Sequence, residues 1–229
     1  KLRRKMTAPE PLLGWAVTEA ISVMENGLHF EIRPYDGFSA GLFLDQRDNR
    51  APIVARAPGK DGVKLFGYTC VFSVAAAAGG ANATTSVDIS PRYLDWGRRN
   101  FNCNKVAPED HLFFKSDAAD FLKRARRQGR TYDIVVVDPP SFSHARRGAG
   151  TFSIEKDLPM LATAAFEVLR PSGTLLVSTN YRQATLSGLK ELMGAAAGSR
   201  RITATQALPL PADFAMDPDH AKSLIVSIE

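Results

Sequence analysis

The stretch Asp138-Pro139-Pro140-Ser141-Phe142 carries the clearest chemical information in this sequence of 229 residues. It follows the continuous apolar run Tyr132–Val137, so we expect it at the end of a buried strand. Two consecutive prolines stiffen the turn and leave its backbone carbonyls unused by a helix start. These carbonyls can hold the polar edge of a planar base, and Phe142 can stack on its face, which contributes ~1–3 kcal/mol per base. The alternative is a rigid turn with Phe142 in the core.

Two further carboxylates are expected at strand ends, where open α/β sheets bind ligands. Asp88 follows the strand-like run Ala83–Val87 and can accept hydrogen bonds from ribose hydroxyls, or it can simply neighbour a helix N-cap. Asp117 follows His111–Lys115 and can bind an adenine amine or cap its own helix. Phe66-Gly67-Tyr68-Thr69-Cys70 follows another strand and contains no G-x-G-x-x-G, which disfavours a pyrophosphate-cradling dinucleotide site.

The elements expected to position these residues alternate along the chain from residue 62 onward. Short apolar runs predict strands, and amphipathic segments of helical length predict helices. The alternation predicts an α/β fold with a doubly wound, mostly parallel sheet, and two late strands joined by a loop predict an antiparallel edge hairpin. The expected strands are Val63–Phe66, Ala83–Val87, His111–Lys115, Tyr132–Val137, Thr174–Ser178, Ile202–Leu208 and Ser223–Ile228. The expected helices are Val71–Ala78, Pro91 to about Asn102, the segment between Asp117 and Gly129, Leu158–Leu169 ended by Pro171-Ser172-Gly173, and Leu186–Ala197.

Residues 1–61 have a different pattern. Ser22–Arg33 and Phe38–Leu44 flank the turn-forming residues Pro34–Gly37 and predict a β-hairpin. A hairpin of this size cannot form its own core, so we expect it to pack on the main domain. The predicted organisation is an N-terminal arm with a β-hairpin extension over residues 1–61 and one larger domain over residues 62–229.

The composition is typical of a globular protein, with 45% hydrophobic and 23% charged residues and a net charge of +5. No apolar run approaches the ~20 residues needed to span a bilayer, and no segment resembles a secretory signal. The two cysteines, Cys70 and Cys103, are too few for a disulfide framework or a metal cluster, so we expect no metal and a reducing, cytoplasmic location. The first residue is not Met, which leaves a preceding transit peptide or domain open.

The positive charge is clustered along the chain. Clustered Lys and Arg residues suit a polyanionic partner such as RNA, or they form a solvated helix face; charge alone leaves the two equal. The basic groups are Lys1–Lys5, Lys123–Arg127 with Arg130, Arg146-Arg147 and Arg200-Arg201.

Asp138–Phe142 resembles the catalytic loop of class I S-adenosylmethionine-dependent methyltransferases that act on nucleic-acid bases. From about Val23 to the C-terminus, the combined motifs resemble the bacterial large-subunit ribosomal RNA methyltransferases that modify cytosine C5 or guanine N7. The further stretches that carry this resemblance are Glu25–Phe30, Leu44–Arg50, Phe66–Thr69, Phe72–Ala75, Gly79–Ala81, Ser86–Ser90, Asn100 and Asn104.

The resemblance implies a Rossmann-like fold, S-adenosyl-L-methionine as cofactor and RNA, such as ribosomal RNA, as partner. It implies that Tyr68–Cys70 lies against the methionine end of the cofactor, with Asp88 on the ribose and Asp117 near the adenine. The catalytic residues it implies are Asp138, Pro139, Pro140 and Phe142. The cofactor-binding residues it implies are Phe66, Gly67, Tyr68, Thr69, Cys70, Asp88, Ile89, Ser90, Asp117, Ala118 and Asp138. The substrate-binding residues we expect are Asp45, Gln46, Arg47, Arg50, Arg146 and Arg147.

An arginine pair at Arg47 and Arg50 can clamp a carboxylate or phosphate, or it can be a structural ion pair that joins hairpin to domain. Three features depart from the family pattern. Cys70 stands where the family has Gly, so its Cβ can crowd the site or strain the backbone. No cysteine occurs in Val177–Tyr181 or in the Pro139-Pro140 loop, and Cys103 is expected to be a buried small hydrophobe. The family's RNA-binding domain before the hairpin has no counterpart in these 229 residues.

The missing cysteine disfavours 5-methylcytosine chemistry, because that reaction needs a thiolate that attacks cytosine C6. We therefore expect methyl transfer to a base nitrogen of structured RNA, and a guanine N7 acceptor needs no general base. Arg146-Arg147 and Lys123–Arg130 are expected to contact phosphates. Two alternatives stay open: a methyltransferase of a small molecule or protein on the same fold, and a non-catalytic RNA-binding relative, which Cys70 favours.

Overall fold

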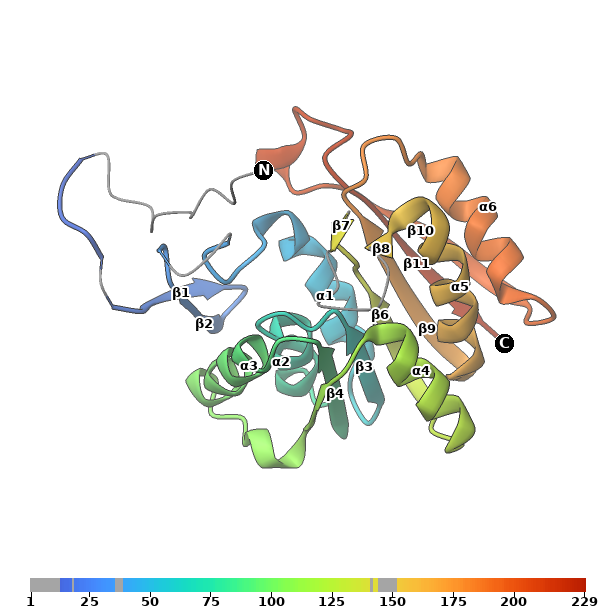
Figure 1. The fold of residues 1–229 in the computed structure, drawn as a ribbon, viewed down its shortest axis with the longest axis horizontal. Coiled ribbons are helices and arrows are strands. Elements are labelled where there is room, and N and C mark those ends of the chain that lie inside the picture. The colour runs from blue at the N-terminus through green and yellow to red at the C-terminus, as the bar shows by residue number, and fades with distance from the viewer. Residues whose placement is uncertain (1–12, 18, 36–38, 141, 144–151) are drawn as a thin grey trace, which may run out of the picture.

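The computed structural model describes residues 13–17, 19–35, 39–140, 142–143 and 152–229. The strands of its main sheet are β3 (Asp61–Leu65), β4 (Ala83–Asp88), β5 (Leu112–Lys115), β6 (Tyr132–Val137), β9 (Leu169–Thr179), β10 (Ile202–Leu208) and β11 (Lys222–Ile228). They lie in the order β10-β11-β9-β6-β3-β4-β5 (Figure 1). The neighbouring strands β9, β6, β3, β4 and β5 run parallel, whereas β11 is antiparallel to β9 and to β10. The predicted mostly parallel, Rossmann-like sheet with an antiparallel edge is confirmed.

Helices cover both faces of this sheet. One face carries α1 (Arg47–Arg56), α2 (Val71–Ala78) and α3 (Pro91–Cys103), and the other carries α4 (Ala118–Arg127), α5 (Ile154–Glu167) and α6 (Leu186–Ala197). Strand β6 shows the reason, because successive side chains of a strand point to opposite faces. Val135 and Val137 pack in the core with α4, α5 and α6, while Ile134 and Val136 pack with α1 and α2. A strand covered on both faces is apolar throughout, as its sequence indicates.

Local capping signals position two of the helices that follow strand ends. The Ser90 hydroxyl accepts a hydrogen bond from the Tyr93 backbone N–H at 3.4 Å, and Pro91 occupies the first turn of α3. The Asp117 carboxylate accepts hydrogen bonds from two backbone N–H groups of α4, at 2.8 and 3.2 Å. Ser90 and Asp117 are therefore N-caps, and each fixes a helix start next to the end of a strand.

The N-terminal hairpin differs from the prediction. It consists of β1 (Ile21–Glu25) and β2 (Leu28–Ile32), paired antiparallel around Asn26-Gly27, so the predicted pairing of Ser22–Arg33 with Phe38–Leu44 was wrong. Asn26 and Gly27 have φ angles of 51° and 79°. This is the conformation of a tight two-residue hairpin turn, for which Asn-Gly is the strongest local signal.

The hairpin packs on the main domain through α3. The Asn100 side chain accepts a hydrogen bond from the Glu31 N–H at 2.8 Å, and the Asn104 side chain bonds to both backbone groups of His29, at 2.8 and 2.6 Å. The Trp96 indole donates to the Glu31 carbonyl at 3.0 Å. These side chains satisfy the backbone groups of β2 that would otherwise form an open sheet edge.

Helix α1 was not predicted. Its first turn is polar and it contains Pro52, so no apolar periodicity marks it. Nevertheless Ile53 and Ala57 belong to the same core cluster as Phe72 of α2. Residues of the predicted N-terminal extension therefore share the core of the sheet, and the division of the chain at residue 61 stays a prediction.

Two boundaries in the C-terminal half were also misplaced. Helix α5 begins at Ile154 rather than Leu158, because both side chains belong to its buried face. The segment Pro171–Gly173, predicted to end that helix, instead lies within β9, whose pairing with β6 shifts in register there. The remaining short elements are η1 (Leu44–Gln46), η2 (Pro108–Asp110), η3 (Ala212–Phe214), β7 (Phe142–Ser143) and β8 (Phe152–Ser153). Among the described residues, no helix combines the length and apolar character needed to cross a membrane.

Candidate functional site

A cavity of about 650 Å³ lies at the carboxyl ends of β3, β4 and β6. This volume is typical of small-molecule sites, and this edge is where open α/β sheets bind ligands. The predicted site residues that line the cavity are Asp45, Gln46, Arg50, Phe66, Gly67, Tyr68, Thr69, Asp88, Ile89, Ser90, Asp117, Ala118, Asp138, Pro139 and Pro140.

The other predicted site residues fall into two groups. Arg47 and Cys70 are described but do not line the cavity. Arg146 and Arg147 lie outside the described residues, and so does the side chain of Phe142. The roles predicted for these last three residues stay predictions.

The turn between β3 and α2 has an unusual backbone. Phe66, Tyr68 and Cys70 have φ angles of 56°, 48° and 60°, in the left-handed region that residues other than glycine rarely adopt. Each such residue costs about 1–3 kcal/mol and persists only where surrounding contacts enforce it. Here Thr69 supplies such contacts, since its hydroxyl donates to the Gly41 carbonyl at 2.6 Å and its carbonyl accepts from the Asn100 side chain. A strained turn at the cavity wall is typical of a ligand site.

Asp88 joins this turn to the end of β4. One carboxylate oxygen accepts a hydrogen bond from the Tyr68 N–H at 2.8 Å, and the other accepts one from the Ser90 N–H at 2.8 Å. Burial raises the pKa of Asp88, and these two donors together with the charge of Lys64 oppose that effect. The carboxylate thus has a fixed orientation in the cavity wall, as a ribose-binding acid requires.

Cys70 does not occupy the cavity, although its backbone is strained. Its side chain is buried against α3, where a Cβ on Gly97 would lie 2.3 Å from the Cys70 sulfur. Burial raises the pKa of the thiol to about 12. The predicted backbone strain is therefore present, whereas crowding of the site is avoided because α3 carries a glycine at the point of closest approach.

Lys64 and three aromatic residues of the cavity, Phe43, Phe72 and Tyr93, were missed by the sequence analysis. Lys64 lies within β3, and its ammonium is 3.7 Å from the carboxylate of Asp138. A lysine inside an apolar strand of a sheet covered on both faces is unusual, and that was the available signal. Phe43 and Tyr93 also line the cavity, with ring centres 5.1 and 4.6 Å from that of Tyr68.

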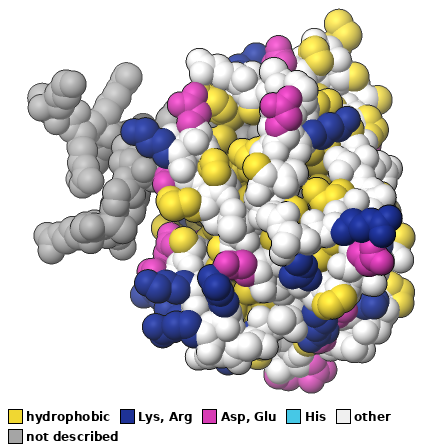
Figure 2. Space-filling model, turned by 90° about the vertical axis from the view of Figure 1, so that its right-hand side faces the viewer, with side chains coloured by type: hydrophobic (Ala, Val, Ile, Leu, Met, Phe, Trp, Pro, Cys, Tyr) yellow, Lys and Arg dark blue, Asp and Glu magenta, His cyan; other side chains and the backbone are white. Residues whose placement is uncertain are grey.

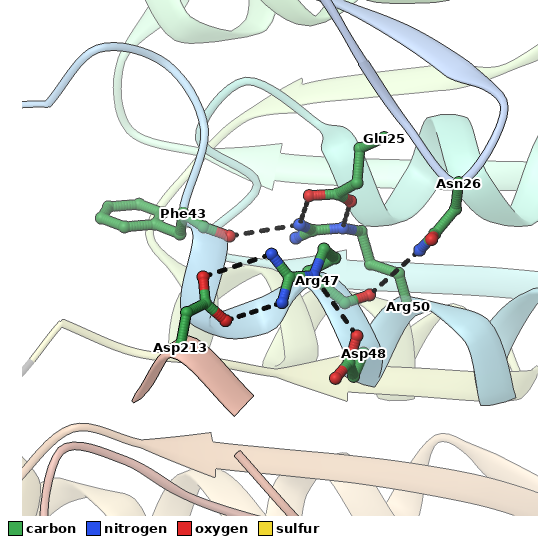
Figure 3. A network of polar contacts seen from close by, with 7 residues as sticks. All are labelled: Glu25, Asn26, Phe43, Arg47, Asp48, Arg50 and Asp213. Atoms are coloured by element: carbon green, nitrogen blue, oxygen red, sulfur yellow. Dashed lines mark hydrogen bonds and ion pairs between the residues drawn. The ribbon is translucent and has the colours of Figure 1, made fainter. Parts of the chain in front are cut away.

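On the opposite side of the cavity, Arg50 forms a buried ion pair. Its guanidinium donates to both carboxylate oxygens of Glu25 at 2.6 Å, and the two side chains are 4% and 6% exposed. It also donates to the Phe43 carbonyl at 3.2 Å (Figure 3). Of the two alternatives for this arginine, the structure shows the ion pair that joins hairpin to domain.

Arg47 points toward Asp213 in the C-terminal part of the chain (Figure 3). Its guanidinium donates to both carboxylate oxygens of Asp213, at 2.7 and 3.3 Å. The two side chains are 31% and 50% exposed, so this pair is partly solvated. Arg47 and Arg50 therefore do not converge on one ligand but fasten α1 to two different segments.

A buried polar network fixes the start of α1 on the sheet. The Gln46 side chain donates to the Ser178 hydroxyl at 3.0 Å. The Asn49 side chain donates to the Ser223 hydroxyl and to the side-chain amide oxygen of Gln46, both at 2.9 Å. Ser223 and Ser178 are hydrogen-bonded to each other at 2.9 Å. The network positions η1, and hence Asp45, against the ends of β9 and β11.

Asp45 brings a second carboxylate to the side of Asp138. Burial and the neighbouring charge of Asp138 raise the pKa of Asp45. His220 lies 3.5 Å from its carboxylate and packs on the Phe214 ring. In the described part of the chain, no group of three or more His, Cys, Asp or Glu side chains is arranged to hold a metal ion.

Exposed basic side chains lie on α4, which begins at the cavity with Ala118 and extends about 15 Å from it. Figure 2 shows Lys and Arg side chains spread among acidic ones on one face of the molecule, with several together at the lower left. Arg200, by contrast, donates to two backbone carbonyls and is structural. The exposed basic residues on α4 and just after it are Lys123, Arg124, Arg126, Arg127 and Arg130.

Comparison with known proteins identifies similar chains. A family model described as S-adenosylmethionine-dependent methyltransferase matches residues 3–224. The chain is 38% identical over 167 residues to ribosomal RNA large subunit methyltransferase K of Neisseria meningitidis serogroup B, and the match covers 73% of this chain and 47% of that protein. It is 35% identical over 219 residues to ribosomal RNA large subunit methyltransferase K/L of Methylococcus capsulatus, and that match covers 95% of this chain and 29% of that protein.

Among solved structures, SMU.776, a methyltransferase complexed with SAH, superposes with a TM-score of 0.87 at 36% identity, over 94% of this chain and 58% of that one. The chain spans less than half the length of the two curated relatives named above. The family model, however, covers nearly all of it. The chain therefore belongs to the S-adenosylmethionine-dependent methyltransferase family.

Proposed function

We propose that this chain catalyses methyl transfer from S-adenosyl-L-methionine to a base nitrogen of structured RNA, and that this RNA is ribosomal. The observation that carries the proposal is the shared cavity, in which Asp88 at the end of β4 and Asp138-Pro139-Pro140 at the end of β6 line one space. In this proposal the donor and a planar acceptor bind side by side in that space. The names of the two relatives supply the acceptor class.

The lining of the cavity fits a cofactor that carries a positive charge. Among the described residues, the basic side chains that line it are Arg50 and Lys64, and Arg50 is already paired with Glu25. When bound, the cofactor supplies a methyl group on a sulfonium that is activated for displacement. We assign Asp88 to its ribose, the Phe66–Thr69 turn to its methionine end and Asp117 to its adenine. The carboxylates that line the cavity are Asp45, Asp88, Asp117 and Asp138.

In this proposal the residues of the chain orient the acceptor. Asp138 and the carbonyls of Pro139 and Pro140 hold the polar edge of the base, and Phe142 stacks on its face. A guanine N7 acceptor attacks with its own lone pair, so no proton has to be removed before the displacement. Positioning of donor and acceptor is then the main catalytic contribution of the protein.

The positions of the cysteines argue against transfer to cytosine C5. The chain contains two, Cys70 and Cys103, and neither lines the cavity. The Cys70 thiol is buried with a raised pKa, which disfavours the thiolate that would attack cytosine C6. Cys103 is exposed at the end of α3, which corrects the expectation that it is buried.

RNA as the substrate class is supported by the exposed basic residues on α4 and just after it, and α4 begins at the cavity. Lys123, Arg127 and Arg130 are available for phosphates, and Arg146-Arg147 are assigned the same role from the sequence. Cys70 no longer favours a non-catalytic relative, because its side chain lies against Gly97 rather than in the cavity. A ribosomal RNA substrate implies that the reaction takes place in the cytoplasm.

The test is transfer of a radiolabelled methyl group from S-adenosylmethionine to deproteinised large-subunit ribosomal RNA, with transfer RNA and a protein mixture as competing acceptors. We expect labelling of ribosomal RNA, loss of at least ~100-fold in rate in Asp138→Ala, and little change in the control Asp95→Ala on the exposed surface of α3. Mass spectrometry of the nucleosides then identifies the modified atom. Labelling of protein alone, or 5-methylcytosine as the product, would contradict the proposal.

A further inference from the structure

Lys64 is a buried lysine at the centre of the sheet. It lies on β3, between β4 and β6, and is 5% exposed. Its ammonium donates to the Leu65 carbonyl at 3.0 Å and lies 3.7 Å from a carboxylate oxygen of Asp138, and its side chain lines the cavity. Desolvation makes a lysine in this position costly, whereas an apolar residue would fill the same strand position without that cost. The residue therefore calls for a functional explanation.

Asp138 is the counter-ion of Lys64, because the other basic group nearby already has its own partner. Arg50, whose guanidinium lies over the same Phe72 ring as the Lys64 ammonium, is balanced by Glu25. The titratable groups that lie against Lys64 or share the cavity wall with it are Asp138 after β6, Asp88 at the end of β4, Asp117 before α4, Asp45 on η1, Cys70 before α2, Tyr68 in the turn, Tyr93 on α3 and Arg50 on α1.

Burial makes the proton on Lys64 easier to remove than that of a surface lysine. It lowers the pKa of Lys64 from its ordinary value of 10.5, while the charges of Asp138 and Asp88 oppose this effect. The neutral amine thus becomes populated at a lower pH than on the surface. A ligand that is disfavoured by a positive charge in the cavity wall would promote this loss of the proton.

The methyl donor and its product differ in just such a charge. S-adenosylmethionine carries a sulfonium, whereas S-adenosylhomocysteine has a neutral thioether at the same place. Their nucleoside and amino-acid parts are the same. A charged lysine in the cavity wall therefore weakens binding of the donor relative to the product.

We propose that Lys64 is a specificity-determining residue of this cavity, which binds the cationic donor in preference to the neutral product only when Lys64 has lost its proton. The inference rests on the proposed function, because it requires both ligands to bind here. Donor binding to the charged form releases the Lys64 proton to the solvent, while product binding leaves it in place. Donor affinity should thus rise with pH through the Lys64 titration, and product affinity should not.

The experiment is calorimetric titration with S-adenosylmethionine and S-adenosylhomocysteine between pH 6.5 and 9.5. Lys64→Met removes the charge and keeps the length, and Lys60→Met removes an exposed charge next to Asp133 as the control. In the native chain and in Lys60→Met, we expect the donor-to-product affinity ratio to rise at least about tenfold over this range, because a like charge in a partly buried wall opposes binding of the donor. In Lys64→Met the ratio should be high and constant.

The outcomes separate this inference from the proposed function. If neither ligand binds the folded native chain, the proposed function is wrong. If both bind and the ratio follows the same pH course in the native chain and in Lys64→Met, the role of Lys64 is wrong. Should Lys64→Met fail to fold, titrations of the native chain in buffers of different ionisation enthalpy measure the proton release directly. Release of a proton with the donor but not with the product supports the role of Lys64, and equal release with both ligands contradicts it.

Discussion

The two sides of the cavity are held in place by different kinds of interaction. On the sheet side, formed by residues 66–69, 88–90, 117–118 and 138–140, backbone groups at strand ends and helix starts bond to nearby carboxylates. On the N-terminal side, formed by residues 43–50, side chains bond to partners far along the chain. Arg50 pairs with Glu25. Gln46 bonds to Ser178, which is 132 residues away, and Asn49 bonds to Ser223, which is 174 residues away.

The difference concerns how each side tolerates change. A wall built from backbone geometry keeps its shape when single side chains are altered, because the sheet and its caps define it. A wall built from side-chain pairs depends on every partner, and a buried charge that loses its partner is strongly destabilising. We therefore expect single substitutions to loosen the N-terminal side more readily than the sheet side.

The largest contrast is expected in thiol reactivity, which reports whether the sheet side opens. Cys70 is buried with a pKa raised to about 12, while Cys103 is exposed. At pH 8 a thiol reagent should modify Cys70 at least ~1000-fold more slowly than Cys103, because reaction requires opening of the fold. The measurement follows chromophore release from the native chain and from Cys103→Ser. Rapid modification of Cys70 in folded Cys103→Ser would mean that the sheet side is not rigid.

The next largest effect is expected on the N-terminal side. Arg50→Ala leaves the Glu25 carboxylate buried without its partner and should lower the free energy of unfolding by about 3–5 kcal/mol. Arg47→Ala, three residues earlier, removes a partly exposed pair with Asp213 and should have a much smaller effect. Urea denaturation of both variants measures the contrast. Equal losses would show that burial does not separate the two arginines.

A smaller effect is expected when a carboxylate of the sheet side is removed. Asp88→Ala leaves the Tyr68 and Ser90 N–H groups without their acceptor, so binding of S-adenosylhomocysteine should weaken by about 2 kcal/mol, roughly 30-fold. Calorimetric titration gives the affinity, and Asp95→Ala serves as an exposed control. An unchanged affinity in Asp88→Ala would remove this residue from the proposed ribose site.

The smallest effect tests the contact between the strained turn and α3. Gly97→Ala places a methyl group against the Cys70 sulfur and should destabilise the chain by about 1 kcal/mol, overpacking outweighing the gain in helix propensity. In a Cys70→Gly background the same substitution should be neutral or stabilising. Gly194→Ala on α6, where no atom lies within 4 Å of the added Cβ, is the matched control and should stabilise. Additive effects of the two changes would exclude the contact.

The sheet side of the site could be predicted from the sequence because its signals are local. Asp138-Pro139-Pro140 directly follows a buried strand, and Ser90 and Asp117 are capping residues at helix starts. Lys64 could have been noticed as a charge inside an apolar strand at the centre of the sheet. In the hairpin, Asn26-Gly27 was the correct turn signal, but the more conspicuous Pro34–Gly37 was preferred.

The N-terminal side could not be predicted in the same way. Helix α1 has a polar first turn and an internal proline, so its stability depends on tertiary contacts rather than on periodicity. Its anchors, Ser178 and Ser223, are ordinary serines in late strands, and no local pattern connects them to Gln46 or Asn49. The same long separation hid the ion pair between Arg47 and Asp213.

The network that joins Asn49 to Ser223 also has a consequence for biosynthesis. The two residues are 174 positions apart, so a ribosome that adds about 5–20 residues per second needs roughly 10–35 s between them. During that interval the nascent chain can form the parallel strands, but the anchor for the N-terminal side does not yet exist. The cavity therefore acquires its complete wall only after β11 has been synthesised, and a cofactor that binds to the finished cavity would stabilise the product of that last step.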